Sequence, residues 1–433
     1  MGKIQDDDKL YRLAKVIVDH HIRRSFKRYH VTGKENIPKQ GLCLFGSNHC
    51  NTLMDALVLV TSTMHKKVFI ARGDIFKNHF VARLLTWAKI LPIFRMRDGL
   101  DSVRNKNGDT IEQAVDVIHD EVPLYIFPEA THRTKHSLRN LSKGIFHIAL
   151  EANRRYGHEK PMYIVPVGLE YGDYFRFRST VLVSYGEPIN VTEYVNQHAD
   201  ENEVAIMNSL KEILTERMSR LISFIPDDEA DYEPIWEMTK IIAGNPPLPL
   251  KARLKRNRRI IANILKFKSE NPEKARTLFD KVSDFAKHRK EQSISLNSVS
   301  KRKPLWRTVW KSLMALVGLP FYLLAAAVTS PIWIVSSFIL DSLKDKAFRN
   351  TANYCVELVL HPLIMATGVT LLFCLTPWEW AVVGSIFLYY SYVFYFDYNE
   401  YIRLLTSDWR WTFNKALRKE FKELGLLDKE WER

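Results

Sequence analysis

His49 and Asp55 are the two side chains of this sequence whose types and spacing are best suited to moving a proton. An alcohol is a poor nucleophile at neutral pH, and histidine is the side chain whose ordinary pKa lies nearest to that pH. A carboxylate can hold the proton on one ring nitrogen, so that the other nitrogen can accept a proton. The pair predicts activation of a hydroxyl group. The alternative is a loop histidine followed by an ordinary helix-capping aspartate.

The apolar segments on either side of this pair predict how it is positioned. Residues 42–45 read as a buried strand, and Asp55 opens the apolar stretch 56–60, which reads as a helix. We therefore expect His49 on the turn between a strand and a helix, where a rigid scaffold commonly presents catalytic groups. An aspartate near a helix N-terminus remains ionised.

A second group of polar residues follows another predicted strand, residues 124–127. Pro128 ends that strand and Glu129 follows it, so a carboxylate is expected at the carboxyl edge of the sheet, where α/β proteins bind ligands. The next residues form a cationic run suited to a phosphate: His132, Arg133, Lys135, His136, Arg139 and Lys143. A solvated basic face is the alternative interpretation.

A third apolar segment, residues 90–94, is followed by Arg95 and Arg97. Arginine matches phosphate oxygens with a planar, forked set of donors. Further strands are predicted at 68–71, 162–170 and 180–188, with helices around 110–119 and 204–222. Strands that alternate with helices indicate an α/β domain.

These segments, in this order, resemble the glycerolipid acyltransferase superfamily. Its first motif is a histidine followed by a spaced aspartate, and its third motif reads Phe-Pro-Glu-Gly-Thr, which here is Phe127-Pro-Glu-Ala-Thr131. The five residues between His49 and Asp55, together with His132, resemble the glycerol-3-phosphate/dihydroxyacetone-phosphate acyltransferase branch. Val165-Pro166-Val167 matches the fourth motif, and the resemblance covers roughly residues 10 to 225.

The resemblance implies a role for each matching residue. His49 would be the general base and Asp55 its orienting partner, with direct attack of the acceptor hydroxyl on an acyl thioester and no covalent intermediate. The implied substrate-binding residues are Arg95, Arg97, Glu129, Thr131, His132, Arg133, Arg139, Lys143 and Pro166. Two positions depart from the family pattern: Ala130 replaces the usual glycine, and His132 replaces a common arginine. Phosphate binding is therefore expected to shift to Arg133, Arg139 or Lys143.

Cys50 offers a rival mechanism, because a thiolate beside a histidine can be a nucleophile. Neighbouring residues seldom point at each other on a strand or turn, which disfavours that role. The four cysteines show no metal-ligand spacing, so no metal site and a reducing compartment are expected. The sequence also lacks a Gly-x-Ser-x-Gly elbow, a Walker loop and a Rossmann glycine fingerprint.

Three nearly uncharged segments occupy the carboxyl-terminal third: residues 312–340, 356–375 and 378–396. About 20 apolar residues cross the hydrocarbon core, so each predicts a membrane segment rather than a core helix of a soluble protein. Pro320 and Pro331 interrupt the first segment, which fits either a tilted span or a re-entrant hairpin. Cations flank it on both sides, and the positive-inside tendency then favours the hairpin.

The net charge of +14 suits a binding partner that is negatively charged, such as nucleic acid, anionic lipid headgroups or an acidic carrier protein. Among these partners, the apolar segments favour a membrane. The cations of residues 251–259 lack the interleaved aromatic residues of a nucleic-acid surface, so no nucleic acid is expected. Leu10, Leu13 and Ile17 recur on one face of a predicted helix, which suits an anionic membrane surface as well as ordinary packing. The first nine residues show no signal-peptide pattern, which predicts a cytosolic start.

The expected fold is α/β, a mixed sheet flanked by helices, followed by a basic helical region and membrane helices. The expected segments are an N-terminal amphipathic helix (1–30), an acyltransferase domain (31–225), a basic helical region (226–290), a linker (291–304), membrane-embedded segments (305–400) and a cytosolic tail (401–433).

The resemblance and the membrane segments together imply an integral membrane enzyme of phospholipid biosynthesis whose catalytic domain faces the cytoplasm. It would transfer a fatty acyl group from acyl-CoA or acyl-carrier protein to the sn-1 hydroxyl of glycerol 3-phosphate, and to dihydroxyacetone phosphate, with no bound cofactor. The alternatives are acylation of lysophosphatidate and a non-catalytic membrane scaffold.

Overall fold

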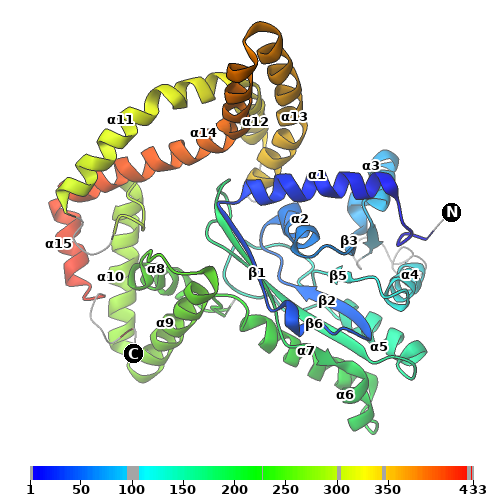
Figure 1. Cartoon of the computed structure of the whole chain (residues 1–433). Coiled ribbons are helices and arrows are strands. Elements are labelled where there is room, and N and C mark those ends of the chain that lie inside the picture. Colours follow the sequence, from blue (N-terminus) through cyan, green and yellow to red (C-terminus); the bar gives the residue numbers. More distant parts are fainter. Residues whose placement is uncertain are drawn as a thin grey trace. The chain divides into compact units, whose positions relative to one another are not determined.

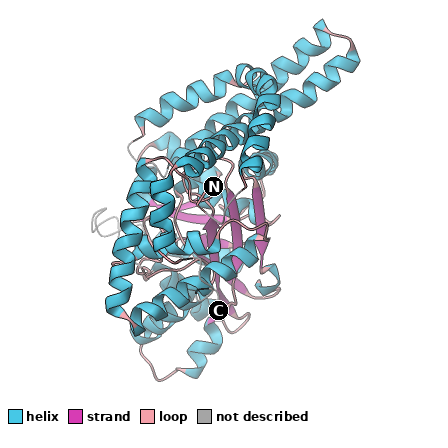
Figure 2. Cartoon of the chain, turned by 90° about the vertical axis from the view of Figure 1, so that its left-hand side faces the viewer, coloured by secondary structure: helices cyan, strands magenta, loops and turns pink. Residues whose placement is uncertain are grey.

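The computed structural model describes residues 3–94, 107–226, 228–299, 304–343, 348–426 and 431. The chain divides into two compact units. Unit 1 comprises Met1–Phe175 and Ser179–Phe224, and unit 2 comprises Arg176–Arg178 and Ile225–Arg433. Within the described residues every strand belongs to unit 1, and unit 2 is helical (Figure 2).

Unit 1 is built on an eight-stranded mixed sheet with the order β1-β7-β6-β2-β5-β3-β4, and β8 pairs with β6. The strands are β1 (Arg28–Thr32), β2 (Leu42–Ser47), β3 (Val68–Arg72), β4 (Ile90–Ile93), β5 (Leu124–Ile126), β6 (Met162–Tyr171), β7 (Thr180–Tyr185) and β8 (Ile189–Asn190). β6 pairs in antiparallel fashion with β7 and β8, and the other pairs are parallel. This confirms the predicted α/β class with a mixed sheet.

Helices cover both faces of this sheet (Figure 1). The helices of unit 1 are α1 (Lys9–Ser25), α2 (Thr52–Ser62), α3 (His79–Trp87), α4 (Asn107–His119), α5 (Gly144–Tyr156), α6 (Val191–Gln197) and α7 (Glu203–Ser219), with short 3-10 turns at Lys34–Asn36 and Gly73–Phe76. Alternate residues of β2 face opposite sides. Leu42 and Leu44 join the aliphatic core with α4, α5 and α7, whereas Phe45 stacks on Tyr125 at 4.5 Å between ring centroids.

Three strand ends meet at one edge of the sheet because β2, β5 and β6 run parallel. β2 is hydrogen-bonded to β5 on one side and to β6 on the other. The carboxyl end of β2 leads into His49, that of β5 leads into Glu129, and β6 ends at Tyr171. The sheet therefore delivers three chemically active side chains to a single edge.

α2 begins three residues earlier than its apolar pattern predicts. It starts at Thr52, so Asp55 lies in its first turn rather than at its first residue. The reason is that the Asp55 carboxylate accepts hydrogen bonds from the backbone N–H groups of Cys50 (2.8 Å) and Asn51 (2.7 Å), which satisfies donors that precede the helix.

The basic helical region has a hydrophobic core of its own. α8 (Tyr232–Ala243), α9 (Leu250–Glu270), α10 (Pro272–Glu291) and α15 (Lys415–Glu423) supply most of this core. Ile294 and Val299, from the serine-rich segment expected to be a linker, are buried in the same cluster. That segment is therefore packed into the helical core of unit 2.

The apolar carboxyl-terminal third forms four long helices: α11 (Leu305–Val328), α12 (Ser330–Ser342), α13 (Arg349–Leu375) and α14 (Trp378–Phe413). The first predicted segment breaks once, at Thr329 just before Pro331, whereas Pro320 lies inside α11. α14 continues to Phe413 as one helix of 36 residues, beyond the expected end of the membrane region at 400.

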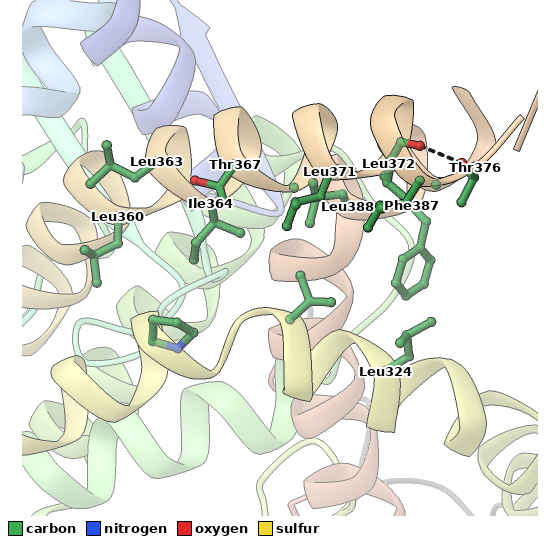
Figure 3. A pocket seen from close by; sticks show the side chains of 15 residues that line it. Leu324, Leu360, Leu363, Ile364, Thr367, Leu371, Leu372, Thr376, Phe387 and Leu388 are labelled. Carbon is green, nitrogen blue, oxygen red and sulfur yellow. Dashed lines mark hydrogen bonds between the residues drawn. The ribbon is translucent and has the colours of Figure 1, made fainter. Parts of the chain in front are cut away.

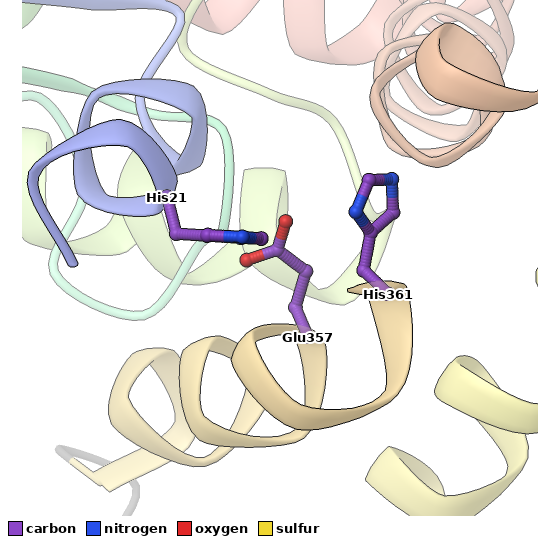
Figure 4. A group of neighbouring side chains, drawn as sticks. All are labelled: His21, Glu357 and His361. Carbon is purple, nitrogen blue, oxygen red and sulfur yellow. The ribbon is translucent and has the colours of Figure 1, made fainter. Parts of the chain in front are cut away.

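Two of these helices, α11 and α13, are long and apolar enough to cross a membrane, and few of their apolar residues are buried. α14 does not reach that standard along the described chain, because tyrosines and charged residues interrupt its apolar run. The amino-terminal half of α13 carries buried polar side chains, including Glu357 and His361 one turn apart (Figure 4). The carboxyl-terminal half is aliphatic.

An apolar cavity of about 720 Å³ lies between α11, α12, α13 and α14 (Figure 3). Its wall is almost entirely aliphatic, with Leu324 from α11, Leu371 from α13 and Leu388 from α14. The Thr376 hydroxyl at its end already donates to the Leu372 carbonyl (2.7 Å). Such a lining offers water few partners and suits hydrocarbon.

Candidate active site

His49 and Asp55 form a hydrogen-bonded pair at the carboxyl edge of β2. His49 Nδ1 lies 2.8 Å from Asp55 Oδ2. The imidazole keeps 19% of its side-chain surface exposed, and the carboxylate is fully buried. The imidazole also stacks on Phe127 with 4.4 Å between ring centroids. With the proton held on Nδ1 by the carboxylate, Nε2 is the nitrogen available to take a proton from a bound hydroxyl.

Asp55 is held by donors on both of its oxygens. Oδ2 accepts from His49 and from the backbone N–H groups of Cys50 and Asn51, and Oδ1 accepts from the Tyr171 hydroxyl at 2.8 Å. A buried carboxylate remains charged when several donors and a helix N-terminus face it. The arrangement therefore gives a fixed negative charge behind the imidazole.

Glu129 ties the His49 turn to the loop that follows β5. Its carboxylate accepts the backbone N–H of His49 (2.9 Å) and the backbone N–H of Arg139 (2.9 Å). The backbone N–H of Arg133 in turn donates to the His49 carbonyl (3.0 Å). The His49 backbone is thus held through both its N–H and its carbonyl. Glu129 acts on the architecture of the site, a function that its sequence position alone did not indicate.

The cationic run lies in the same loop, beside His49. The His132 ring lies 5.8 Å from the His49 ring, centroid to centroid. Arg139 donates to the Thr131 hydroxyl (2.6 Å), and both Arg139 and Lys143 are exposed. Lys143 directly precedes α5, at the positive end of the helix dipole. This group can receive a phosphate next to the imidazole.

Arg95 and Arg97 lie outside the described residues. Pro166 is buried in β6, opposite Gly46 of β2 in the sheet register.

Two residues at the site were missed by sequence reasoning. The Asn48 side chain donates to the Leu169 carbonyl (3.0 Å) and accepts from its N–H (2.7 Å), which fixes the turn to β6. Tyr171 directly follows the predicted strand 162–170, which is the one signal that could have placed it at this edge.

Cys50 does not have the properties of a nucleophile. Its side chain is 2% exposed, and burial together with the Asp55 carboxylate raises the pKa of its thiol well above the usual range. A buried, protonated thiol is a poor nucleophile. The geometry thus favours the histidine over the cysteine as the reactive group.

Ala130 adopts a left-handed backbone conformation, with φ of +60°. The resemblance places a glycine at this position, and glycine is the residue that adopts this conformation without steric cost. Alanine here costs about 1–2 kcal/mol, partly offset by the smaller conformational freedom of its unfolded chain.

We predict that Ala130→Gly raises the stability of unit 1 by about 0.5–1 kcal/mol, because relief of left-handed strain exceeds the entropic cost of glycine. Thermal unfolding of the purified protein measures this change. As a matched control, Ala152→Gly lies inside helix α5 and should destabilise the protein. A loss of stability in Ala130→Gly would contradict the assigned strain.

Burial raises the pKa of Glu129 to about 7, although the two backbone donors oppose this shift. A carboxyl whose folded-state pKa is raised contributes stability at pH 4, and that contribution is lost as pH rises through about 7. We therefore predict that the melting temperature of the wild type falls, relative to that of Glu129→Gln, between pH 4.5 and 7.5. Parallel melting curves for the two proteins across this range would show that Glu129 does not titrate there.

The comparisons with known proteins agree with this geometry. The acyltransferase family model matches residues 28–170, a range that contains His49, Asp55 and Glu129. The chain is similar to Glycerol-3-phosphate O-acyltransferase 2 of Saccharomyces cerevisiae, with 28% identity over 169 residues, which cover 38% of this chain and 22% of that protein. The matched part therefore spans about a fifth of the yeast relative's length.

Among solved structures, the chain is similar to the 1-acyl-sn-glycerophosphate (LPA) acyltransferase PlsC from Thermotoga maritima. That similarity has 18% identity and a TM-score of 0.34, and it covers 49% of this chain and 82% of that one. The family match, together with the ordered motifs at one edge of the sheet, leads to one conclusion. Residues 28–170 match the acyltransferase family model, and this part of the chain is similar to the glycerolipid acyltransferase superfamily.

Proposed function

We propose that this protein is a membrane-bound O-acyltransferase that moves a fatty acyl group from acyl-CoA or acyl-carrier protein to the sn-1 hydroxyl of glycerol 3-phosphate. The observation that carries the proposal is the 2.8 Å contact between His49 Nδ1 and the buried Asp55, beside a cationic loop in which Arg139 and Lys143 are exposed. A small phosphate monoester needs these two features together: a base for its hydroxyl and positive charge for its phosphate.

The reaction follows from the geometry of the pair. His49 Nε2 accepts the proton of the acceptor hydroxyl as the hydroxyl oxygen attacks the thioester carbonyl. The C–O bond forms, the tetrahedral intermediate collapses, and the C–S bond breaks. The imidazolium then returns its proton to the departing thiolate, so the products are an ester and a thiol. Asp55 stabilises the imidazolium throughout.

The phosphate of the acceptor is assigned to the cationic loop. His132, Arg133, Arg139 and Lys143 lie in the segment that Glu129 ties to His49. Arginine offers a planar fork and lysine a compact charge, and both suit phosphate oxygens. Dihydroxyacetone phosphate carries the same phosphate and a hydroxyl, which makes it a further acceptor. Similarity to the yeast glycerol-3-phosphate acyltransferase supports this assignment.

Exposed apolar side chains support attachment to a membrane. α11 and α13 have large hydrophobic residues on their surfaces, for example Leu316 (65% exposed) and Leu363 (59%). A core helix of a soluble protein would bury such residues, and a bilayer would cover them. In unit 1, α1 exposes Leu10 and Leu13, and α3 exposes Phe80, which suits contact with a membrane surface.

We predict that the purified, detergent-solubilised protein transfers a labelled acyl group to glycerol 3-phosphate and dihydroxyacetone phosphate. His49→Ala should abolish this transfer while the protein remains folded, because the substitution removes the base. Radiolabelled product formation measures both. Turnover of lysophosphatidate alone would replace the proposal with the alternative, 1-acyl-glycerol-3-phosphate acyltransferase. Wild-type turnover of none of the three acceptors would favour a non-catalytic scaffold.

The cationic flanks of the α13–α14 hairpin predict its orientation. Arg349 is the first residue of α13, and Arg410 and Lys415 lie at the other end of the pair. The turn at Thr376–Pro377 is followed by Trp378 and Trp380. By the positive-inside tendency the turn lies on the side opposite the cytoplasm. An N-glycosylation acceptor carried in a flexible insert at this turn should be glycosylated in microsomes.

The control insert belongs between α6 and α7, at Asp200, and should stay unmodified. Glycosylation at Asp200, or an unmodified insert at the turn, would contradict a cytosolic catalytic unit with a membrane-crossing hairpin.

A further inference from the structure

We propose that Tyr171 is a positioning residue that orients Asp55 and tunes the proton affinity of the His49–Asp55 pair. The inference rests on the proposed roles of these two residues. It adds to the site a residue that the motif pattern does not contain. Tyr171 touches neither His49 nor a substrate atom in this account, and acts through the carboxylate.

The two oxygens of Asp55 differ in their partners. Oδ2 has three nitrogen donors: His49 Nδ1 and the backbone N–H groups of Cys50 and Asn51. Oδ1 faces the Tyr171 hydroxyl at 2.8 Å and the weakly donating Cys50 thiol at 3.8 Å. A hydroxyl is much the stronger donor of these two. Tyr171 therefore fixes the rotation of the carboxylate about its Cβ–Cγ bond, which aims Oδ2 at the imidazole.

The sheet holds Tyr171 in place. It is the last residue of β6, pairs with Val181 of β7 and is 1% exposed. Its ring packs near Phe26 and Tyr174, at 6.1 and 5.9 Å between centroids. Burial and the neighbouring Asp55 raise the pKa of its hydroxyl well above the usual range, so the hydroxyl keeps its proton and remains a donor.

This contact has a direct chemical consequence. A hydrogen bond from Tyr171 draws electron density from the carboxylate and makes it a weaker acceptor for the imidazolium proton. Loss of the bond should leave a more basic Asp55 and raise the pH at which His49 becomes neutral.

The other titratable groups facing the pair stay the same in a Tyr171 variant. Among the described residues, Cys50 in the β2–α2 turn and Glu129 and His132 in the loop after β5 lie beside the pair, Glu170 on β6 lies near Cys50, and Tyr29 on β1 lies near Tyr171.

The test uses the 433-residue protein with Tyr171→Phe. A phenyl ring keeps the packing, and the space of one oxygen atom is too small for a water molecule to restore the bond. We expect kcat to fall about tenfold and KM for the acceptor to change less than about twofold. The acidic limb of the kcat/KM profile should move up by roughly 0.5–1 pH unit.

Tyr29→Phe is the matched control. The Tyr29 hydroxyl donates to the Val58 carbonyl at 2.8 Å and does not reach Asp55. Val58 and Asp55 both belong to α2, so the two tyrosines contact the same helix. This variant should leave the acidic limb in place. 3-Fluorotyrosine at position 171 is a stronger hydrogen-bond donor of nearly the same shape, so it should move the acidic limb in the opposite direction. This variant keeps the proposal testable if Tyr171→Phe does not fold.

A second readout does not depend on acyl transfer. The rate at which diethyl pyrocarbonate modifies His49, followed by peptide mass spectrometry against pH, reports the ionisation of the imidazole directly. We expect its midpoint to rise in Tyr171→Phe and to stay unchanged in Tyr29→Phe. Should the wild type acylate no acceptor, the proposed function fails, and this titration still decides the role of Tyr171.

Two results would overturn the proposal. One is an unchanged midpoint and acidic limb in Tyr171→Phe, even if the protein melts earlier, because this is what a purely structural role produces. The other is an equal shift in Tyr29→Phe, which would show that the effect does not pass through the Asp55 hydrogen bond.

Discussion

The buried carboxylate of Asp55 is the constraint on which the rest of the site depends. A charge with 0% exposure is tolerated when donors surround it, and here an imidazole, two backbone N–H groups and a tyrosine hydroxyl do so. These partners come from the β2–α2 turn and from β6. The start of α2, the shape of the turn and the direction of the His49 ring are consequences of satisfying one carboxylate.

The sheet makes this arrangement possible because parallel strands end at the same edge. β2 lies between β5 and β6, so its turn can be held from both sides. From β5 the Glu129 carboxylate reaches the His49 N–H, and from β6 the Leu169 backbone pairs with the Asn48 side chain. Neither contact involves a reacting atom. Both contacts reduce the motion of the imidazole relative to the cationic loop. His49 is therefore held about as rigidly as a residue within a strand, although it lies in a loop.

Much of this could be predicted from local patterns. Apolar runs located β2 and β5, and the order of the motifs pointed to the acyltransferase superfamily. Partnerships across the sheet could not be predicted, because no spacing rule connects Tyr171 to Asp55 across 116 positions. The backbone partners of Glu129 were equally hidden, since a carboxylate after a strand reads as a ligand group. The start of α2 was missed because a side chain, not hydrophobic periodicity, determines it.

In unit 2, the composition predicted which segments are apolar helices better than it predicted where these helices begin and end. The apolar runs correctly marked α11 and α13 as candidate spans. The break at Thr329 depends on backbone hydrogen bonding. The continuation of α14 to Phe413 depends on the packing of the polar second half of that helix. A hydropathy pattern contains neither kind of information. The expected linker differs for a similar reason, since Ile294, Leu296 and Val299 anchor part of it to the helical core although its composition is polar.

The central claim is that a carboxylate, not merely an acceptor of similar shape, must face His49 Nδ1. Asp55→Asn tests it most directly, because the amide keeps the size of the side chain. Its oxygen can still accept from His49 Nδ1 and from the Cys50 and Asn51 N–H groups, so the negative charge is what the substitution removes. Single-turnover acyl transfer at saturating acceptor should measure the loss. We predict a fall of about 10²–10⁴-fold in a folded protein, because the imidazolium loses its charged partner. A rate within tenfold of the wild type would contradict it.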